Sequence, residues 1–116
     1  MKQYTTNEQT AKLIKLGFKK PNGWYVDGVM NNVKLYVNID ENPMMFNYSI
    51  GELIELLPEK INNDTLPDMF GVYIDHNKMW TVDYSNILGE LYSTYRTELI
   101  DALYDMIVKL KEEGVI

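Results

Sequence analysis

Residues Thr97–Gly114 read TELIDALYDMIVKLKEEG and form the longest uninterrupted periodic run in the sequence. Apolar side chains recur on one side of a helix that turns by about 100° per residue. They are Leu99, Leu103, Met106, Ile107 and Leu110, with Ile100 at the edge of the stripe. Thr97 is placed to cap the first turn, and Gly114 can adopt the left-handed conformation that ends a helix. A helix with one apolar stripe needs a surface to cover, so this run predicts a helix packed on a sheet.

Two shorter helices are predicted earlier in the chain. The first spans Asn7 to Leu16, and Gly17 ends it. Two pairs can form its capping box: Thr5 with Glu8, or Thr6 with Gln9. In the second helix, Ser49 and Glu52 form the capping box, and Pro58 stops the helix. Its apolar side consists of Ile50, Leu53, Ile54 and Leu57.

Residues Trp24–Asp40 predict a first β-hairpin, because apolar and polar residues alternate over Val33–Asp40. A two-residue turn at Asn31-Asn32 places the apolar residues of both strands on one face, whereas a turn at Asp27-Gly28 loses this agreement. The stretch Met44–Tyr48 that follows is apolar and has no assigned structure.

Residues Phe70–Tyr84 predict a second hairpin. A three-residue loop, with Asn77 or Lys78 in the left-handed region, keeps Ile74 and the apolar side of the returning strand on one face. The next stretch permits a helical turn or a strand, and we expect an edge strand near Glu90–Thr94.

The predicted order is therefore α-β-β-α-β-β-(β)-α, in one domain of residues 1–116. Short turns between strands imply an antiparallel sheet of two hairpins, with or without a fifth edge strand. Amphipathic helices would cover this sheet on one face, which defines an α+β fold.

Composition limits the function. The net charge of -6 argues against generic nucleic-acid binding, which needs a basic surface. No cysteine is available for a disulfide, a thiolate metal site or a nucleophile. The sequence contains no apolar run of membrane-spanning length and no signal peptide at its start, so we expect a cytoplasmic protein. Nine of the 14 aromatic residues are tyrosine, a residue favoured at protein interfaces.

The chemistry-bearing candidates are few. His76, next to Asp75 in the second hairpin loop, is either a general base or an exposed turn residue. Asp75 is poorly placed to orient it, because adjacent strand residues point to opposite faces. Asp101 and Asp105 lie one helical turn apart and either bind a cation or form a solvated helix face with Lys109 as the partner of Asp105. No motif implies a cofactor or metal, and no residue is assigned as catalytic.

Tyr104 and Val108 lie at the margin of the apolar stripe of Thr97–Gly114. If they are exposed they widen it into a contact patch, and if they are buried they belong to the core. Together with Asp101 and Asp105 they are the predicted interaction residues. The predicted function is a non-enzymatic domain that binds a protein partner or self-associates, and one specific form is an acidic inhibitor of a host protein. A small-ligand binder or small enzyme that uses Asp, Glu, Tyr and His76 is the alternative.

Three segments in this order resemble small uncharacterised proteins of bacterial phages, prophages and conjugative elements. The segments are TAKLIKLGF at Thr10–Phe18, GELIELLP at Gly51–Pro58, and TELIDALY at Thr97–Tyr104 with Leu110 beyond it. The resemblance implies an accessory protein of a mobile element. It implies no activity and no functional residues.

Overall fold

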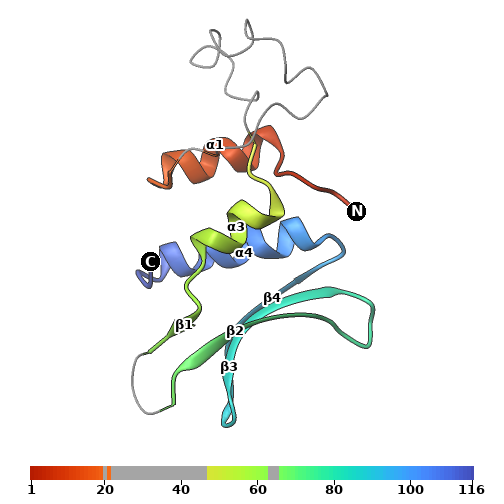
Figure 1. Cartoon of the computed structure of the whole chain (residues 1–116), viewed down its shortest axis with the longest axis vertical. Helices are drawn as coiled ribbons and strands as arrows, with labels where there is room; N and C mark the ends of the chain where they lie inside the picture. The colour runs from red at the N-terminus through yellow and green to blue at the C-terminus, as the bar shows by residue number, and fades with distance from the viewer. Residues whose placement is uncertain (20, 22–46, 63–65) are drawn as a thin grey trace, which may run out of the picture.

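The computed structural model describes residues 1–19, 21, 47–62 and 66–116 (Figure 1). Within these residues it has three helices and one four-stranded sheet. In chain order, labelled as in Figure 1, they are α1 (Asn7–Lys15), α3 (Ile50–Leu56), β1 (Lys60–Ile61), β2 (Asp68–Ile74), β3 (Trp80–Asn86), β4 (Gly89–Arg96) and α4 (Leu99–Glu112). The predicted hairpin at Trp24–Asp40 and most of the apolar stretch after it lie outside the described residues. The predicted α+β class is confirmed.

The sheet is antiparallel throughout, with strand order β1-β2-β3-β4. Ile74 pairs with Trp80, as the second predicted hairpin requires. The loop between them closes through Asp75, whose amide donates to the Met79 carbonyl at 3.0 Å, so the loop itself has three residues. Lys78 has a φ of 62°, which confirms the predicted left-handed position.

The edge strand is confirmed and is longer than predicted, because β4 spans Gly89–Arg96. Asn86 pairs with Gly89, so a two-residue turn at Ile87-Leu88 joins β3 to β4, and Gly89 has a φ of 140°. An irregularity in register at Tyr84/Ser85 bends the ladder. The two-residue β1 was not predicted, since its residues carry no alternating pattern.

The helices cover one face of the sheet, to which β3 contributes the buried Val82 and Tyr84. Figure 1 shows α4 between the sheet and α1, with α3 beside α4. A helix between two layers is buried on more than one stripe, and this is why Ile100 and Val108 join the core. The single apolar stripe predicted for this helix was therefore too narrow.

The starts of the helices follow local sequence signals in two cases out of three. A complete capping box starts α1, formed by Thr6 and Gln9, and another starts α3, formed by Ser49 and Glu52. The cap predicted at Thr97 is wrong, because the N-cap of α4 is Glu98 and no side chain bonds to the free amides there. Gly114, with a φ of 75°, ends α4 as predicted.

Candidate functional site

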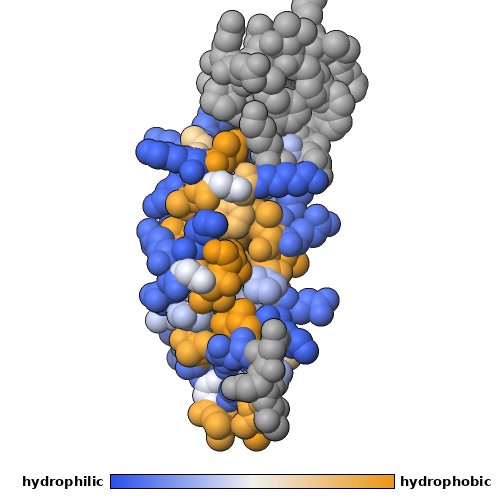
Figure 2. Space-filling view, turned by 90° about the vertical axis from the view of Figure 1, so that its left-hand side faces the viewer, coloured by the Kyte–Doolittle hydropathy of each residue, from blue (hydrophilic) through white to orange (hydrophobic). Residues whose placement is uncertain are grey.

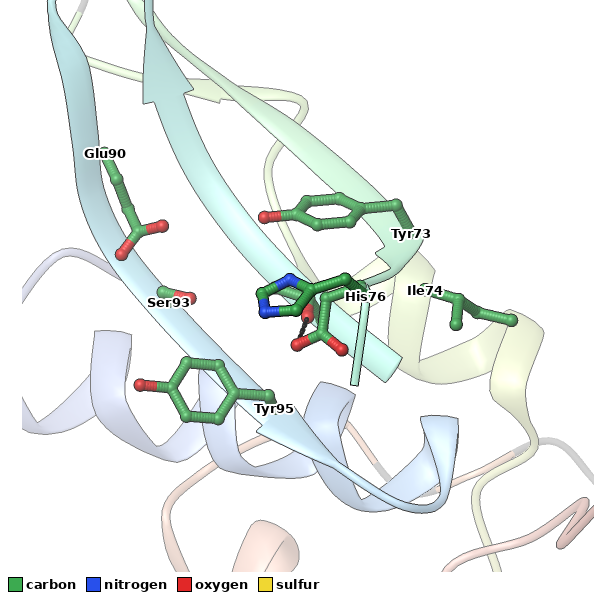
Figure 3. Close-up of a pocket in the computed structure, with 8 residues that line it drawn as sticks. Tyr73, Ile74, His76, Glu90, Ser93 and Tyr95 are labelled. Atoms are coloured by element: carbon green, nitrogen blue, oxygen red, sulfur yellow. Dashed lines mark hydrogen bonds between the residues drawn. The ribbon is translucent and has the colours of Figure 1, made fainter. Parts of the chain in front are cut away.

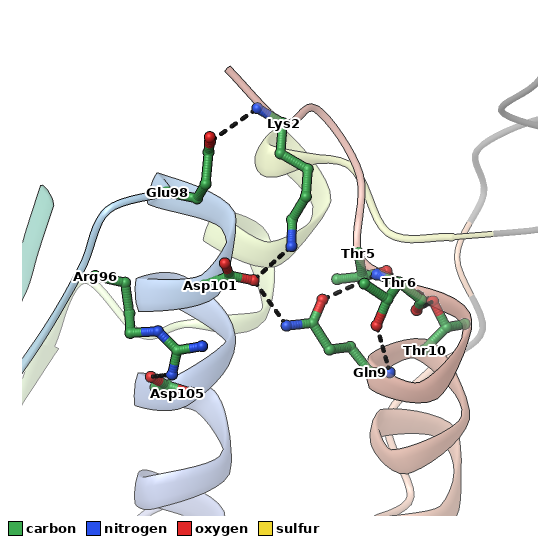
Figure 4. Close-up of polar contacts among 9 residues, drawn as sticks. All are labelled: Lys2, Thr5, Thr6, Gln9, Thr10, Arg96, Glu98, Asp101 and Asp105. Atoms are coloured by element: carbon green, nitrogen blue, oxygen red, sulfur yellow. Dashed lines mark hydrogen bonds and ion pairs between the residues drawn. The ribbon is translucent and has the colours of Figure 1, made fainter.

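Asp101, one of the predicted interaction residues, is bound within the molecule. Its Oδ1 accepts from Lys2 Nζ at 2.7 Å and from Gln9 Nε2 at 2.9 Å (Figure 4). Burial opposes charge on this carboxyl, but the hydrogen bonds from Lys2 and Gln9 outweigh burial and lower its pKa. The expectation of a merely solvated helix face is therefore wrong at Asp101, which ties the N-terminal segment to α4.

Asp105 is paired with Arg96, whose Nη1 lies 2.8 Å from Asp105 Oδ2 (Figure 4). The predicted pairing with Lys109 is wrong, because Lys109 Nζ lies 5.7 Å from the centre of the Tyr92 ring instead. Burial raises the pKa of Asp105 despite this ion pair. The acidic side of α4 is thus partly neutralised by cations of the same chain.

The other two predicted interaction residues differ from each other in burial. Val108 is 9% exposed and belongs to the core, so it offers no contact surface. Tyr104 is half-buried, and burial raises its pKa. Partner binding at Tyr104, Asp101 or Asp105 stays a prediction.

The sheet face that no described helix covers carries a hollow of about 430 Å³. Residues from β2, β3, β4 and the β2–β3 loop meet there. Its lining is Tyr73, Ile74, Asp75, His76, Thr81, Glu90, Ser93 and Tyr95 (Figure 3). Figure 3 shows the rings of Tyr73 and Tyr95 on opposite sides of the His76 imidazole. None of the eight lining residues is Lys or Arg.

The charges of three carboxylates act on the Tyr73 hydroxyl. Burial raises the pKa of the Tyr73 hydroxyl, and the charges of Asp83, Glu90 and Asp75 raise it further. Asp75 itself is held in its charged form by backbone hydrogen bonds from Met79 and Asn77, which lower its pKa. The hollow is therefore an acidic site walled by tyrosines.

Asp83 lies beside the hollow and is only 7% exposed. Its carboxyl occupies the space beside Gly71, which has no side chain, and the nearby Tyr73 hydroxyl favours the charged form of this carboxyl. Burial raises the pKa of Asp83, and the nearby charge of Glu90 raises it further. No Lys or Arg of the described chain forms an ion pair with it.

His76 is a lining residue of the hollow. Asp75 Oδ1 accepts from the amides of Asn77 and Met79 at 2.8 and 3.0 Å, so this oxygen is committed to the loop. This agrees with the prediction that Asp75 is poorly placed to orient His76. Among the described residues, no group of three or more His, Asp or Glu side chains is arranged to hold a metal ion.

A second surface feature is the β3–β4 turn. Ile87 and Leu88 are 89% and 79% exposed. Figure 2 shows hydrophobic side chains at the end of the molecule where Figure 1 places this turn. None of the helices in the described part has the length and apolar character needed to cross a membrane.

Sequence reasoning missed the hollow, although its signal was present. Tyr73 opposes Thr81, and Thr81 opposes Tyr95, so the three share the face opposite to the core residue Val82. Alternation alone predicts that the polar half of each strand faces solvent, and only the pairing of three strands shows that these residues converge. Comparisons of the chain with protein-family models, curated proteins and solved structures gave no match.

Proposed function

We propose that this chain is a non-enzymatic protein-interaction domain that binds a basic segment of a partner protein on the uncovered face of its sheet. The observation that carries the proposal is the hollow itself. It combines exposed rings of Tyr73 and Tyr95 with the carboxylates of Asp75 and Glu90, and no Lys or Arg is found among its described lining residues.

Both parts of this lining favour a cationic side chain. An ammonium or guanidinium group gains from the faces of aromatic rings and from charge-assisted hydrogen bonds to carboxylates. Arginine suits the site better than lysine, because its planar fork can stack on a ring while it bonds to a carboxylate. The net charge of -6 would steer a basic partner toward the domain.

The more specific form of the proposal is an inhibitor that occupies a basic surface of a host protein, in the setting of a mobile element. It needs acidic residues from several elements on one face. Asp75 of the loop, Asp83 of β3 and Glu90 of β4 supply such a set. The Asp101 and Asp105 side chains on α4 supply less free charge, since Lys2 and Arg96 bind them.

A small cationic ligand is the second candidate, because the same hollow contains His76 and two carboxylates. Its size is within the range of small-molecule sites. The hollow is open, and its polar groups point to binding of a cation rather than to a reaction. Arginine amide serves as the probe for this candidate.

The direct test is a titration followed by ¹⁵N–¹H NMR. The probe is a capped octapeptide of alternating Thr and Arg, and its control replaces each Arg by citrulline, a neutral isostere. We expect saturable shifts at Tyr73, Ser93 and Tyr95 with the Arg peptide and none with the citrulline peptide. Binding of arginine amide as tight as that of the octapeptide would favour the small ligand instead.

Glu90→Gln and Glu113→Gln remove the same charge from different places, since Glu113 is an exposed residue at the end of α4. Loss of a charge-assisted bond in the hollow should weaken peptide binding about tenfold in Glu90→Gln. Glu113→Gln should bind as the natural chain does. An equal loss in both variants would mean non-specific attraction and would contradict the proposal.

A further inference from the structure

The backbone of β4 is the free edge of the described sheet. Among the described strands, β4 is the last in the order and pairs only with β3. Its eight residues, GELYSTYR, include no Pro and no Lys, which commonly protect edge strands from pairing. Hydrogen-bonded and non-hydrogen-bonded pairs alternate along an antiparallel ladder. This alternation determines which backbone groups of β4 face outward.

The hydrogen bonds around β2 fix this alternation. Asp75 N bonds to Met79 O across the hairpin, whereas Phe70 N bonds to Glu59 O on the opposite side of β2, each at 3.0 Å. Odd-numbered residues of β2 therefore bond to β3, and even-numbered residues face away from it. By the same alternation, Thr81 and Asp83 of β3 bond to β2, and the even-numbered residues of β3 bond to β4.

The outward groups of β4 thus belong to the residues that oppose Thr81 and Asp83. These are Tyr95 and Ser93. Both also line the hollow with their side chains. A strand added at this edge would bond to the main chain of Ser93 and Tyr95, and its residues opposite them would project over the same sheet face as the hollow, because directly paired residues share a face.

We propose that the partner segment binds as an additional strand on the β4 edge, paired with the backbone of Ser93 and Tyr95, with its basic side chains over the hollow. This inference rests on the proposed function and specifies the conformation of the partner. In this recognition mode, main-chain hydrogen bonds provide affinity and a neighbouring pocket selects alternate side chains. Charge favours a basic partner segment over a second copy of this chain. A second copy of β4 would place Ser and Tyr side chains over the hollow but no cation.

The test uses the same Thr-Arg octapeptide in two backbone-methylated forms. One form is N-methylated at its Thr residues and the other at its Arg residues. In an extended strand these two sets of amides point to opposite sides, so only one set faces β4. We expect one form to lose at least tenfold in affinity and the other to bind within about threefold of the unmodified peptide.

The outcomes separate the two proposals. If the unmodified peptide does not bind in the hollow, the proposed function fails. If the peptide binds but both methylated forms bind equally well or equally poorly, strand addition is overturned while binding in the hollow stands. A concentration-dependent dimer in sedimentation that Ser93→Pro abolishes would also overturn it. Ser93→Pro removes one outward amide and should reproduce the loss.

Discussion

Asp83 Oδ1 lies 2.7 Å from the position that a β-carbon would occupy on Gly71, closer than such atoms can approach. Gly71→Ala must therefore displace a carboxylate that is almost fully buried. We expect the free energy of unfolding to fall by about 1–3 kcal/mol, measured by urea denaturation.

The same substitution should act in the opposite direction when Asp83 is already Ala. Without the carboxylate, Ala at position 71 restricts the unfolded chain and should stabilise the protein by about 0.5–1 kcal/mol. A loss of stability in both backgrounds would show that Gly71 is required for a reason other than Asp83.

Asp83→Asn should stabilise the domain at neutral pH. The folded-state pKa of Asp83 is raised, chiefly by burial, so its stabilising contribution is present below the ordinary pKa of 3.8 and is lost as pH rises through the folded value. Asn avoids this loss, so the gain should appear at pH 7 and vanish below pH 3.8. Urea denaturation across that pH range measures it, and a gain that is independent of pH would contradict the assignment.

The same variant should weaken binding of the Arg peptide, because it removes a charge beside the hollow.

Asp101 and Asp105 should respond differently to Asn substitution. The pKa of Asp101 is lowered, so its stabilising contribution is present above 3.8 and is lost as pH falls through the folded value. Asp101→Asn should cost about 1 kcal/mol of unfolding free energy at pH 7 and less in acid. Asp105 has a raised pKa and a more exposed side chain, 31% against 15%, so Asp105→Asn should change stability by less than about 0.5 kcal/mol.

The caps of the helices provide a matched pair of tests. Ser49→Ala removes a hydroxyl that accepts from the Glu52 amide at 3.1 Å and should cost about 1 kcal/mol in thermal or urea unfolding. Thr97→Ala removes a hydroxyl that caps no amide of α4, and its nearest described partner is the Met79 sulfur at 4.0 Å. It should change stability by less than about 0.5 kcal/mol. An equal cost at both positions would restore Thr97 as the cap.

Val108→Ala distinguishes core from contact surface. Removal of a buried valine side chain down to its β-carbon should cost about 1–2 kcal/mol of unfolding free energy. Ile87→Ala is the control, because Ile87 is almost fully exposed at the β3–β4 turn, and it should change stability by less than about 0.5 kcal/mol. If Val108→Ala left stability unchanged and weakened binding to a partner, Val108 would be a contact residue after all.

Local signals predicted most of the described fold. Capping residues set the starts of α1 and α3. The odd number of residues in the β2–β3 loop set the register of Ile74 against Trp80. Where prediction failed, the deciding interaction was not local. The burial of Val108 depends on a second layer beyond α4, and Lys2 and Gln9 reach Asp101 from more than 90 residues away in the chain.

The candidate site was harder to predict than the fold. His76 was considered because it is the single histidine of the chain. Tyr73, Glu90 and Tyr95 gave no individual signal, and each is an ordinary choice for a strand position that faces solvent. Their convergence is set by the pairing of β2, β3 and β4, which no single stretch of sequence encodes.

The hydrogen bonds of Lys2 and Gln9 to Asp101 affect the order in which the chain can fold during its synthesis. These bonds join residues separated by 99 and 92 positions. Translation completes α4 after every other described element, so α1 leaves the ribosome long before Asp101 exists. Before α4 emerges, α1 can already contact Asn47 through Thr10. The bond from Gln9 to Asp101 must wait for α4, and contacts between positions this far apart along the chain form slowly. A stalled ribosome that exposes the chain only as far as β4 would therefore carry Lys2 and Gln9 without their partner on α4.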